Sequence, residues 1–270
     1  MELTAIDTTL IFLALGGVTG FTAGLLGVGG GIVMLPVLLF VFTAQGMPQS
    51  VIFQVIIGTN MFIIIFTSLF AVIKHQHAGM VMWRASIPLG LASIPGAMLG
   101  STIAAYASFG FLKYGFGLLM AWAAYRSFKS MQPGSDEQQP VFDLRYVIPT
   151  GFLAGALGAM LGVGGGVVSI PIMALFLHYP YKRLAATSSG IILFTAAAAT
   201  FTNIYHGWSV PDLPANAVGY VNITAAIPII IGALPCAPLG AWVNNHLNTR
   251  PLKMIFGLFM AAMSIRFFLL

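Results

Sequence analysis

The sequence LGVGGG occupies residues 26–31 and occurs again at residues 161–166, with a proline five residues after each copy, at Pro36 and Pro171. Each glycine costs about 1 kcal/mol relative to alanine inside a helix, and it admits backbone conformations that other residues resist. We therefore expect the helix to break at each copy. In an apolar chain, glycine-broken segments at matching positions of two halves are typical of the binding site of a secondary transporter.

The composition indicates a membrane protein. Of the 270 residues, 59% are hydrophobic and 6% are charged, and the mean hydropathy is +0.96. A soluble domain carries about 25% charged residues. Since a bilayer span needs about 20 apolar residues, the pattern predicts an all-α polytopic membrane protein. Its eight hydrophobic segments lie near residues 9–42, 50–73, 85–106, 110–129, 146–178, 183–205, 217–243 and 251–269.

The first and fifth segments are too long for one simple crossing, and both contain the glycine motif. Each is expected to form a broken hairpin or a re-entrant helix, which gives up to ten helices. Non-helical backbone at membrane depth persists only where it is buried in protein or lines a wet cavity.

The repeat extends beyond the glycine motif and divides the chain into two homologous four-segment halves. Thr59 and Asn60 match Thr187 and Ser188, and Pro88, Pro95, Leu99 and Gly100 match Pro228, Pro235, Leu239 and Gly240. We expect one transmembrane unit at residues 1–129, a polar linker at 130–143 and a second transmembrane unit at 144–270. Duplicated halves are typical of transporter folds.

The positive charges favour inverted halves. If each glycine segment crosses once, the eleven Lys and Arg residues divide six against five between the two sides. If each segment returns to the side it came from, only Lys113 and Arg266 oppose the other nine. Those nine are Lys74, Arg84, Arg126, Lys129, Arg145, Lys182, Arg183, Arg250 and Lys253. The positive-inside rule therefore predicts inverted repeats in the cytoplasmic (inner) membrane, with both termini outside.

The acidic residues indicate the charge of the substrate. All six lie at ends, in the linker or in loops: Glu2, Asp7, Asp136, Glu137, Asp143 and Asp212. Carboxylates inside a membrane mark proton relays and cation sites, so their absence from the spans argues against a metal-cation transporter. A broken helix instead presents free N–H groups and a positive dipole end, which bind anions.

The predicted substrate site combines both glycine motifs with matched polar residues of the next segments. It comprises Gly29, Gly30, Gly31, Thr59, Asn60, Gly164, Gly165, Gly166, Thr187, Ser188 and Ser189. The alternative role of the hydroxyls and the amide is to join helices by hydrogen bonds. Lys182 and Arg183 are expected to set topology and to steer anions toward the site.

Two further groups of residues have a simpler interpretation. The pairs Gly20–Gly24 and Gly151–Gly155 have the spacing at which small residues let membrane helices pack closely. His75 and His77 lie two apart near the end of a segment, without a visible third metal ligand, and are interpreted as an interfacial polar cluster.

The paired LGVGGG segments, the duplicated four-segment halves and the length resemble the TauE/SafE sulfite exporter family, also called the TSUP family, over essentially the whole chain. The resemblance implies a membrane transporter for a small sulfur-containing anion, and it leaves the direction of transport open.

The leading hypothesis is a secondary transporter that exports sulfite or an organosulfonate such as sulfoacetate. The alternatives are an importer or channel-like facilitator of another sulfur anion such as thiosulfate and, in a different class, a membrane enzyme or sensor. No cofactor, catalytic constellation or nucleic-acid partner is expected. The expected partners are the anionic substrate and the lipid bilayer, while the sequence leaves the coupling ion and the formation of a homo-oligomer open.

Overall fold

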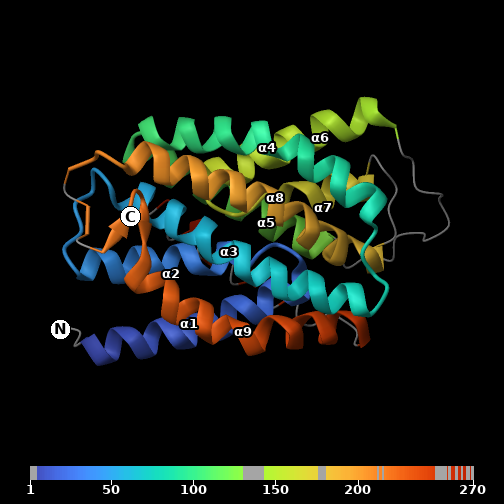
Figure 1. Ribbon diagram of the computed structural model, residues 1–270, viewed down its shortest axis with the longest axis horizontal. Helices are drawn as coiled ribbons and strands as arrows, with labels where there is room; N and C mark the ends of the chain where they lie inside the picture. The colour runs from blue at the N-terminus through green and yellow to red at the C-terminus, as the bar shows by residue number, and fades with distance from the viewer. Residues whose placement is uncertain are drawn as a thin grey trace.

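A computed structural model describes residues 5–129, 143–175, 181–211, 213–214 and 216–246, together with eight residues between 254 and 268 (Figure 1). The described helices are α1 (Ala5–Leu26), α2 (Gly31–Ala44), α3 (Ile52–His77), α4 (Trp83–Tyr106), α5 (Phe109–Lys129), α6 (Leu144–Met160), α7 (Gly166–Leu175), α8 (Tyr181–Gly207) and α9 (Ile223–His246). Two short strands, β1 (Ala217–Val218) and β2 (Val221–Asn222), pair antiparallel. The predicted linker, apart from Asp143, and most of the eighth predicted segment lie outside the described residues.

Five of the described helices are long and apolar enough to cross a bilayer. They are α1 over Thr8–Leu26, α3, α4, α8 over Arg183–Gly207, and α9. Large apolar side chains such as Leu91, Leu118 and Ile231 are exposed on these and neighbouring helices, as contact with lipid requires. The prediction of a largely helical membrane protein is confirmed, and both glycine segments are divided, into α1 with α2 and α6 with α7.

The seventh predicted segment begins earlier than its helix, because α9 starts at Ile223 and not near residue 217. Residues 217–222 form the hairpin of β1 and β2 instead of the first turns of a helix, with Gly219 at φ +57° in its turn. Asn222 caps the start of α9: its Oδ1 accepts a hydrogen bond from the Ala225 N–H at 3.1 Å. The apolar character of Val218 and Val221 concealed this hairpin from sequence reasoning.

Helices from the two halves pack against each other through glycine. α1 lies along α9, and α4 lies along α6 (Figure 1). A Cβ on Gly20 would lie 2.7 Å from the Ala233 carbonyl oxygen, and a Cβ on Gly155 would collide with the Ser93 carbonyl oxygen. The same close approach occurs where Gly24 meets Ala237 and where Gly151 meets Leu89. Small residues therefore bring these backbones into direct contact, as the spacing predicted.

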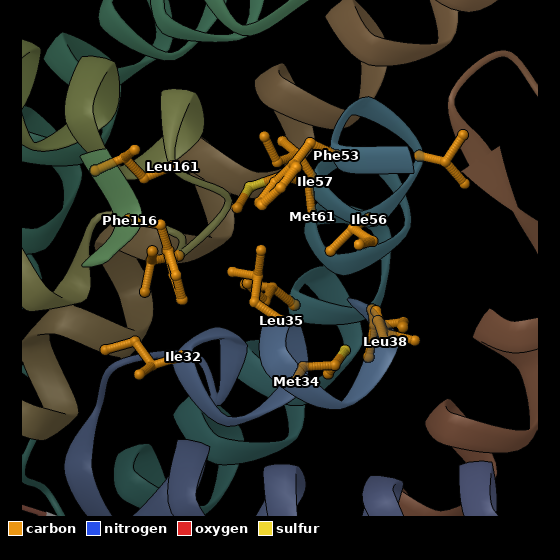
Figure 2. Close-up of a cluster of buried hydrophobic side chains, with 14 of the residues drawn as sticks. Ile32, Met34, Leu35, Leu38, Phe53, Ile56, Ile57, Met61, Phe116 and Leu161 are labelled. Atoms are coloured by element: carbon orange, nitrogen blue, oxygen red, sulfur yellow. The ribbon is translucent and has the colours of Figure 1, made fainter. Parts of the chain in front are cut away.

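The half-length helix α2 is buried over much of its length, while Phe40 near its end is exposed. Its buried residues are Gly31, Ile32, Val33, Met34, Leu35, Leu38, Val41 and Phe42. Figure 2 shows Ile32 and Leu35 among side chains from three other parts of the chain, including Phe53, Phe116 and Leu161. A helix that is apolar on every side is stable only inside protein or lipid. This burial holds the start of α2 in the interior of the bundle.

The glycine contacts between the halves generate a prediction about stability. Gly155→Ala should lower the free energy of unfolding by about 1–3 kcal/mol, because the new methyl forces α4 and α6 apart. The measurement is the melting temperature of the purified protein in detergent. The control is Gly110→Ala on α5, where the added Cβ meets nothing closer than Tyr114 at 4.0 Å. Alanine is the better helix former, so this control should melt at the same or a higher temperature. Equal melting of both variants would contradict the packing role.

Candidate functional site

The two glycine motifs form the breaks in the helices, and they have the same backbone conformation. Gly27, Gly29 and Gly30 have φ values of +64°, +75° and +73°, and the matching Gly162, Gly164 and Gly165 have values of +71°, +79° and +82°. Residues with a Cβ adopt this left-handed region only under strain. The LGVGGG sequence is therefore the local cause of both breaks, and the match extends to each glycine in turn.

The two breaks meet in the interior of the bundle. A Cβ on Gly29 would lie 3.1 Å from Ile64 Cγ2 and 3.4 Å from Ile192 Cγ2. A Cβ on Gly164 would lie 3.0 Å from Ile192 Cγ2 and 3.2 Å from Ile64 Cγ2. Ile64 lies in the middle of α3 and Ile192 in the middle of α8. Both breaks are thus packed on one pair of isoleucines.

The backbones of the two breaks also touch each other directly. A Cβ on Gly31 would lie 3.0 Å from the Gly162 carbonyl oxygen, and a Cβ on Gly166 would lie 2.6 Å from the Gly27 carbonyl oxygen. From this meeting point, α2 and α7 extend toward opposite ends of the molecule (Figure 1). The N-termini of two short helices therefore face each other inside the protein.

These N-termini carry unpaired donors. Among the described hydrogen bonds, none uses the backbone N–H groups of Gly30, Gly31 and Ile32, or those of the matching Gly165, Gly166 and Val167. All six residues are buried. The first N–H groups of a helix have no partner within the helix, and the helix dipole places positive charge there. Two such ends at one place can bind an anion.

Asn60 connects the two breaks. Its Nδ2 donates to the Gly31 carbonyl oxygen at 3.1 Å and to the Gly162 carbonyl oxygen at 2.6 Å. The side chain is fully buried, and its Oδ1 has no partner among the described residues. One carboxamide on α3 thus binds both halves at the meeting point and leaves one acceptor unused.

The matching residue of the second half makes a similar contact. Ser188 Oγ on α8 lies 3.1 Å from Ser169 Oγ, and Ser169 Oγ donates to the Gly166 carbonyl oxygen at 3.5 Å. Both serines are buried. Asn60 on α3 therefore contacts the breaks directly, whereas Ser188 on α8 is connected to the second break through Ser169.

Three of the predicted site residues make their hydrogen bonds elsewhere. Thr59 Oγ1 accepts from the Asn222 N–H at 2.9 Å, next to the start of α9, and Thr187 Oγ1 accepts from the Met82 N–H at 3.3 Å, next to the start of α4. Ser189 Oγ donates to the Ala185 carbonyl oxygen of its own helix at 2.9 Å. These bonds give the three hydroxyls structural partners, and their role in substrate binding stays a prediction.

Sequence reasoning left Thr67 and Ser169 out of the predicted site, although both touch the breaks. Thr67 Oγ1 donates to the Gly29 carbonyl oxygen at 3.2 Å. Thr67 follows Asn60 by seven residues, which is two helical turns and therefore the same face of α3. Ser169 follows Gly166 by three residues, within the first turn of α7. These spacings from Asn60 and Gly166 could have identified Thr67 and Ser169 from the sequence.

The electrostatic surroundings of the breaks are neutral or positive. In the described part of the chain, the carboxylates are Asp7 and Asp143, and both lie at the starts of helices, α1 and α6. Arg183 is exposed at the start of α8, two residues before Ala185, whose carbonyl lies against Gly27. The side chain of Lys182 lies outside the described residues.

Comparison with known proteins agrees with this architecture. The profile of the family described as Sulfite exporter TauE/SafE matches residues 12–267. A protein of Methanocaldococcus jannaschii, named probable membrane transporter protein MJ0441, is 29% identical over 94% of this chain and 93% of its own length. Probable membrane transporter protein YunE of Bacillus subtilis is 28% identical over 91% of this chain and 92% of its own length.

A longer relative contains the same unit. Probable membrane transporter protein MamO of Magnetospirillum gryphiswaldense is 25% identical over 92% of this chain, which covers 43% of that protein. No solved structure is significantly similar to the chain. Because the family profile covers nearly the whole sequence, the chain belongs to the TauE/SafE sulfite exporter family and is an integral membrane transporter.

Proposed function

We propose that the two facing N-termini of α2 and α7 bind a small sulfur-containing anion, and that the protein exports it across the cytoplasmic membrane. The substrate is sulfite or an organosulfonate such as sulfoacetate. The observation that carries the proposal is that the starts of α2 and α7 touch in the interior, where Gly31 lies against Gly162 and Gly166 against Gly27. None of the described hydrogen bonds uses the first N–H groups of either helix. The description of the family as a sulfite exporter supports the choice of an oxyanion.

Neutral groups are sufficient for this site. The tetrahedral or pyramidal oxygens of a sulfur oxyanion can each accept a backbone N–H, and two helix dipoles stabilise its charge. The absence of carboxylates from the described interior removes the main source of repulsion for an anion. Arg183, and Lys182 beside it, would attract anions by long-range electrostatic steering toward the start of α8 and the neighbouring glycine break.

We further propose that the halves are inverted repeats that rock around this site. The support is the set of matched contacts. The Thr59 bond to Asn222 corresponds to the Thr187 bond to Met82, and the packing of α1 on α9 corresponds to that of α6 on α4. In Figure 1, α1 begins at the left of the molecule and α6 at the right. Units of this kind expose a central site to each side alternately.

The first prediction concerns the glycine breaks. Gly29→Ala and Gly164→Ala each place a methyl where the two breaks meet, so they should abolish binding and flux of sulfite or sulfoacetate. The measurement is binding to the purified protein and flux in proteoliposomes. Gly79→Ala is the matched control, because Gly79 also has a positive φ (+67°) but has nothing within 4 Å of an added Cβ. It should retain wild-type affinity.

Normal affinity and flux in both break variants, at equal expression and thermal stability, would remove the glycine breaks from the site. If sulfite moved inward and not outward when equal gradients were applied in the two directions, the binding site would stand and the protein would be an importer. Thiosulfate as the tightest ligand would change the substrate within the same class.

The second prediction separates Asn60 from its neighbour Thr59. Asn60→Ala removes both hydrogen bonds that hold the two breaks together, and so disturbs the position of their N–H donors. It should weaken anion binding by about 1.5–3 kcal/mol, which is about a ten- to hundredfold rise in Kd. Thr59→Ala removes the bond to Asn222 and should lower the melting temperature with little change in Kd. Isothermal titration with sulfite and thermal unfolding on the same samples measure both effects. The reverse pattern would place Thr59, and not Asn60, at the substrate.

The third prediction concerns topology. With both termini outside, the loop at Gly46 faces the outside and the linker faces the cytoplasm. In a Cys236→Ala background, a cysteine at Gly46 should react with an impermeant thiol reagent added to intact cells. A cysteine at Ser135, in the linker beyond the described residues, should react only after the cells are opened. Labelling of the Ser135 position from outside would overturn the orientation.

A further inference from the structure

His75 is buried at the end of α3 and makes two hydrogen bonds that connect three helices. The side chain is fully buried. Its Nε2 lies 3.0 Å from the Gly24 carbonyl oxygen of α1, and its Nδ1 lies 3.1 Å from Asn245 Oδ1 of α9. The neighbouring His77 is exposed. The structure therefore separates two histidines that the sequence grouped as one interfacial cluster.

The partners of His75 allow the imidazole to bind a second proton. A carbonyl oxygen only accepts, so Nε2 carries a hydrogen in every state. Nδ1 faces a carboxamide, which can accept through Oδ1 or donate through Nδ2. With Oδ1 turned to the ring, Nδ1 must also carry a hydrogen, and the ring is an imidazolium. With Nδ2 turned to the ring, the imidazole is neutral.

The observed orientation of the Asn245 carboxamide leaves its Nδ2 without a partner in the described part of the chain, and rotation of the carboxamide would provide one. Asn245 Nδ2 is buried without a partner among the described residues, while Oδ1 faces the ring. Rotation of the carboxamide by half a turn would give Nδ2 the lone pair of a neutral ring. Each protonation state of His75 therefore has its own orientation of Asn245, and a proton can be gained or lost without breaking the contact between α3 and α9.

The position of His75 connects it to the glycine break. Gly24 lies in the last turn of α1, three residues before Gly27. Its neighbour Leu25 is bound in the same way, since Asn244 Nδ2 donates to the Leu25 carbonyl oxygen at 2.6 Å. Side chains of α3 and α9 thus supply the donors that the last carbonyls of α1 lack. The negative end of the α1 dipole favours a positive charge on the ring.

The charged groups around His75 are few. On α3 itself, the charged or titratable neighbours are Lys74 and the exposed His77. On α9, the titratable neighbour is the exposed His246, whose Nδ1 is bonded to the Trp242 carbonyl oxygen. The starts of α4 and α8 add the exposed Arg84 and Arg183, and α1 adds none between Gly16 and Leu26. No carboxylate of the described residues is bonded to His75. A proton on this ring is therefore held by carbonyl oxygens and the helix end, not by a fixed counter-ion.

The second half of the protein has no histidine at the position that matches His75. By the repeat that matches Thr59 to Thr187, His75 corresponds to Asn203, whose Nδ2 donates to Ser101 Oγ at 3.3 Å and to the Ala199 carbonyl oxygen at 2.8 Å. An amide at this position joins helices without titrating. The imidazole in the first half is thus a difference between otherwise matched positions, and structural bridging alone does not require it.

We propose that His75, between the Gly24 carbonyl and Asn245, is a proton-binding site that couples protons to anion transport. Protonation tightens the bridge from α3 to the end of α1 and to α9, and release of the proton loosens it, so the state of the ring biases the glycine break beside it. The proton site stands on the geometry of His75 alone, and its coupling to the anion rests on the proposed function.

The test compares three proteins: wild type, His75→Asn, which copies the residue of the second half, and His77→Asn as the exposed control. Reconstituted wild-type protein should move sulfite several-fold faster when a pH gradient is imposed, and a trapped pH dye should report proton movement with the anion. His75→Asn should bind sulfite with the Kd that wild type shows at a pH where the ring is neutral, and it should lose both responses. His77→Asn should behave as wild type. An unchanged response to the gradient in His75→Asn would overturn the coupling.

A second measurement tests the proton site independently of transport. In protein labelled with ¹⁵N-histidine, the ring signals missing from His75→Asn belong to His75. They should change from the neutral to the charged pattern as the pH is lowered from about 8 to about 4, a window wider than that of an exposed imidazole because the ring is buried. A ring that stays in one protonation state throughout this range would overturn the proton site. Failure of wild type to bind or move any sulfur anion would instead overturn the proposed function, while this titration still decides the proton site.

Discussion

The hydrogen bonds of Asn60 hold together the part of the structure on which the rest depends. Its amide binds one carbonyl from each glycine break, Gly31 in the first half and Gly162 in the second. A backbone break inside a membrane protein leaves polar groups without partners, and each costs several kcal/mol in an apolar interior. By pairing carbonyl oxygens from both breaks at once, Asn60 makes the two irregular segments stable at one place.

The contacts between the halves surround this meeting point. Glycines on α1 and α6 bring those helices against α9 and α4 at backbone distance, and Ile64 and Ile192 pack against both breaks. The carbonyl groups of the breaks accept hydrogen bonds from asparagine, serine and threonine side chains, whereas the N–H groups at the starts of α2 and α7 have no partner in the described part of the chain. The interior therefore supplies donors in a fixed geometry, and this pre-organisation favours an anion.

The sequence predicted the broken helices because glycine at positive φ is a strong local requirement, and the repeat showed that it occurs twice. It predicted which segments carry polar residues, but not where they point. Asn60 and Thr59 are neighbours, and adjacent residues of a helix face different directions; only the tertiary structure shows that Asn60 faces the breaks and Thr59 faces Asn222.

The hairpin at residues 217–222 and the bridge from His75 to α1 were invisible for a similar reason. The hairpin contains apolar residues such as Val218 and Val221 next to an apolar helix, and the partners of His75 are 51 and 170 residues away in the chain. Contacts of this sequence separation depend on how the helices assemble, and no local pattern records them.

The burial of α2 has a consequence for how the protein is made. At 14 residues, α2 is too short to cross a bilayer, for which about 20 residues are needed. During synthesis, α1 and α4 emerge before α9 and α6, so their glycine faces have no partner until the second half is inserted. The Gly162 carbonyl that Asn60 binds also arrives late. The first half is therefore inserted before its packing partners exist. Its helices can complete their contacts only after the second half has been inserted.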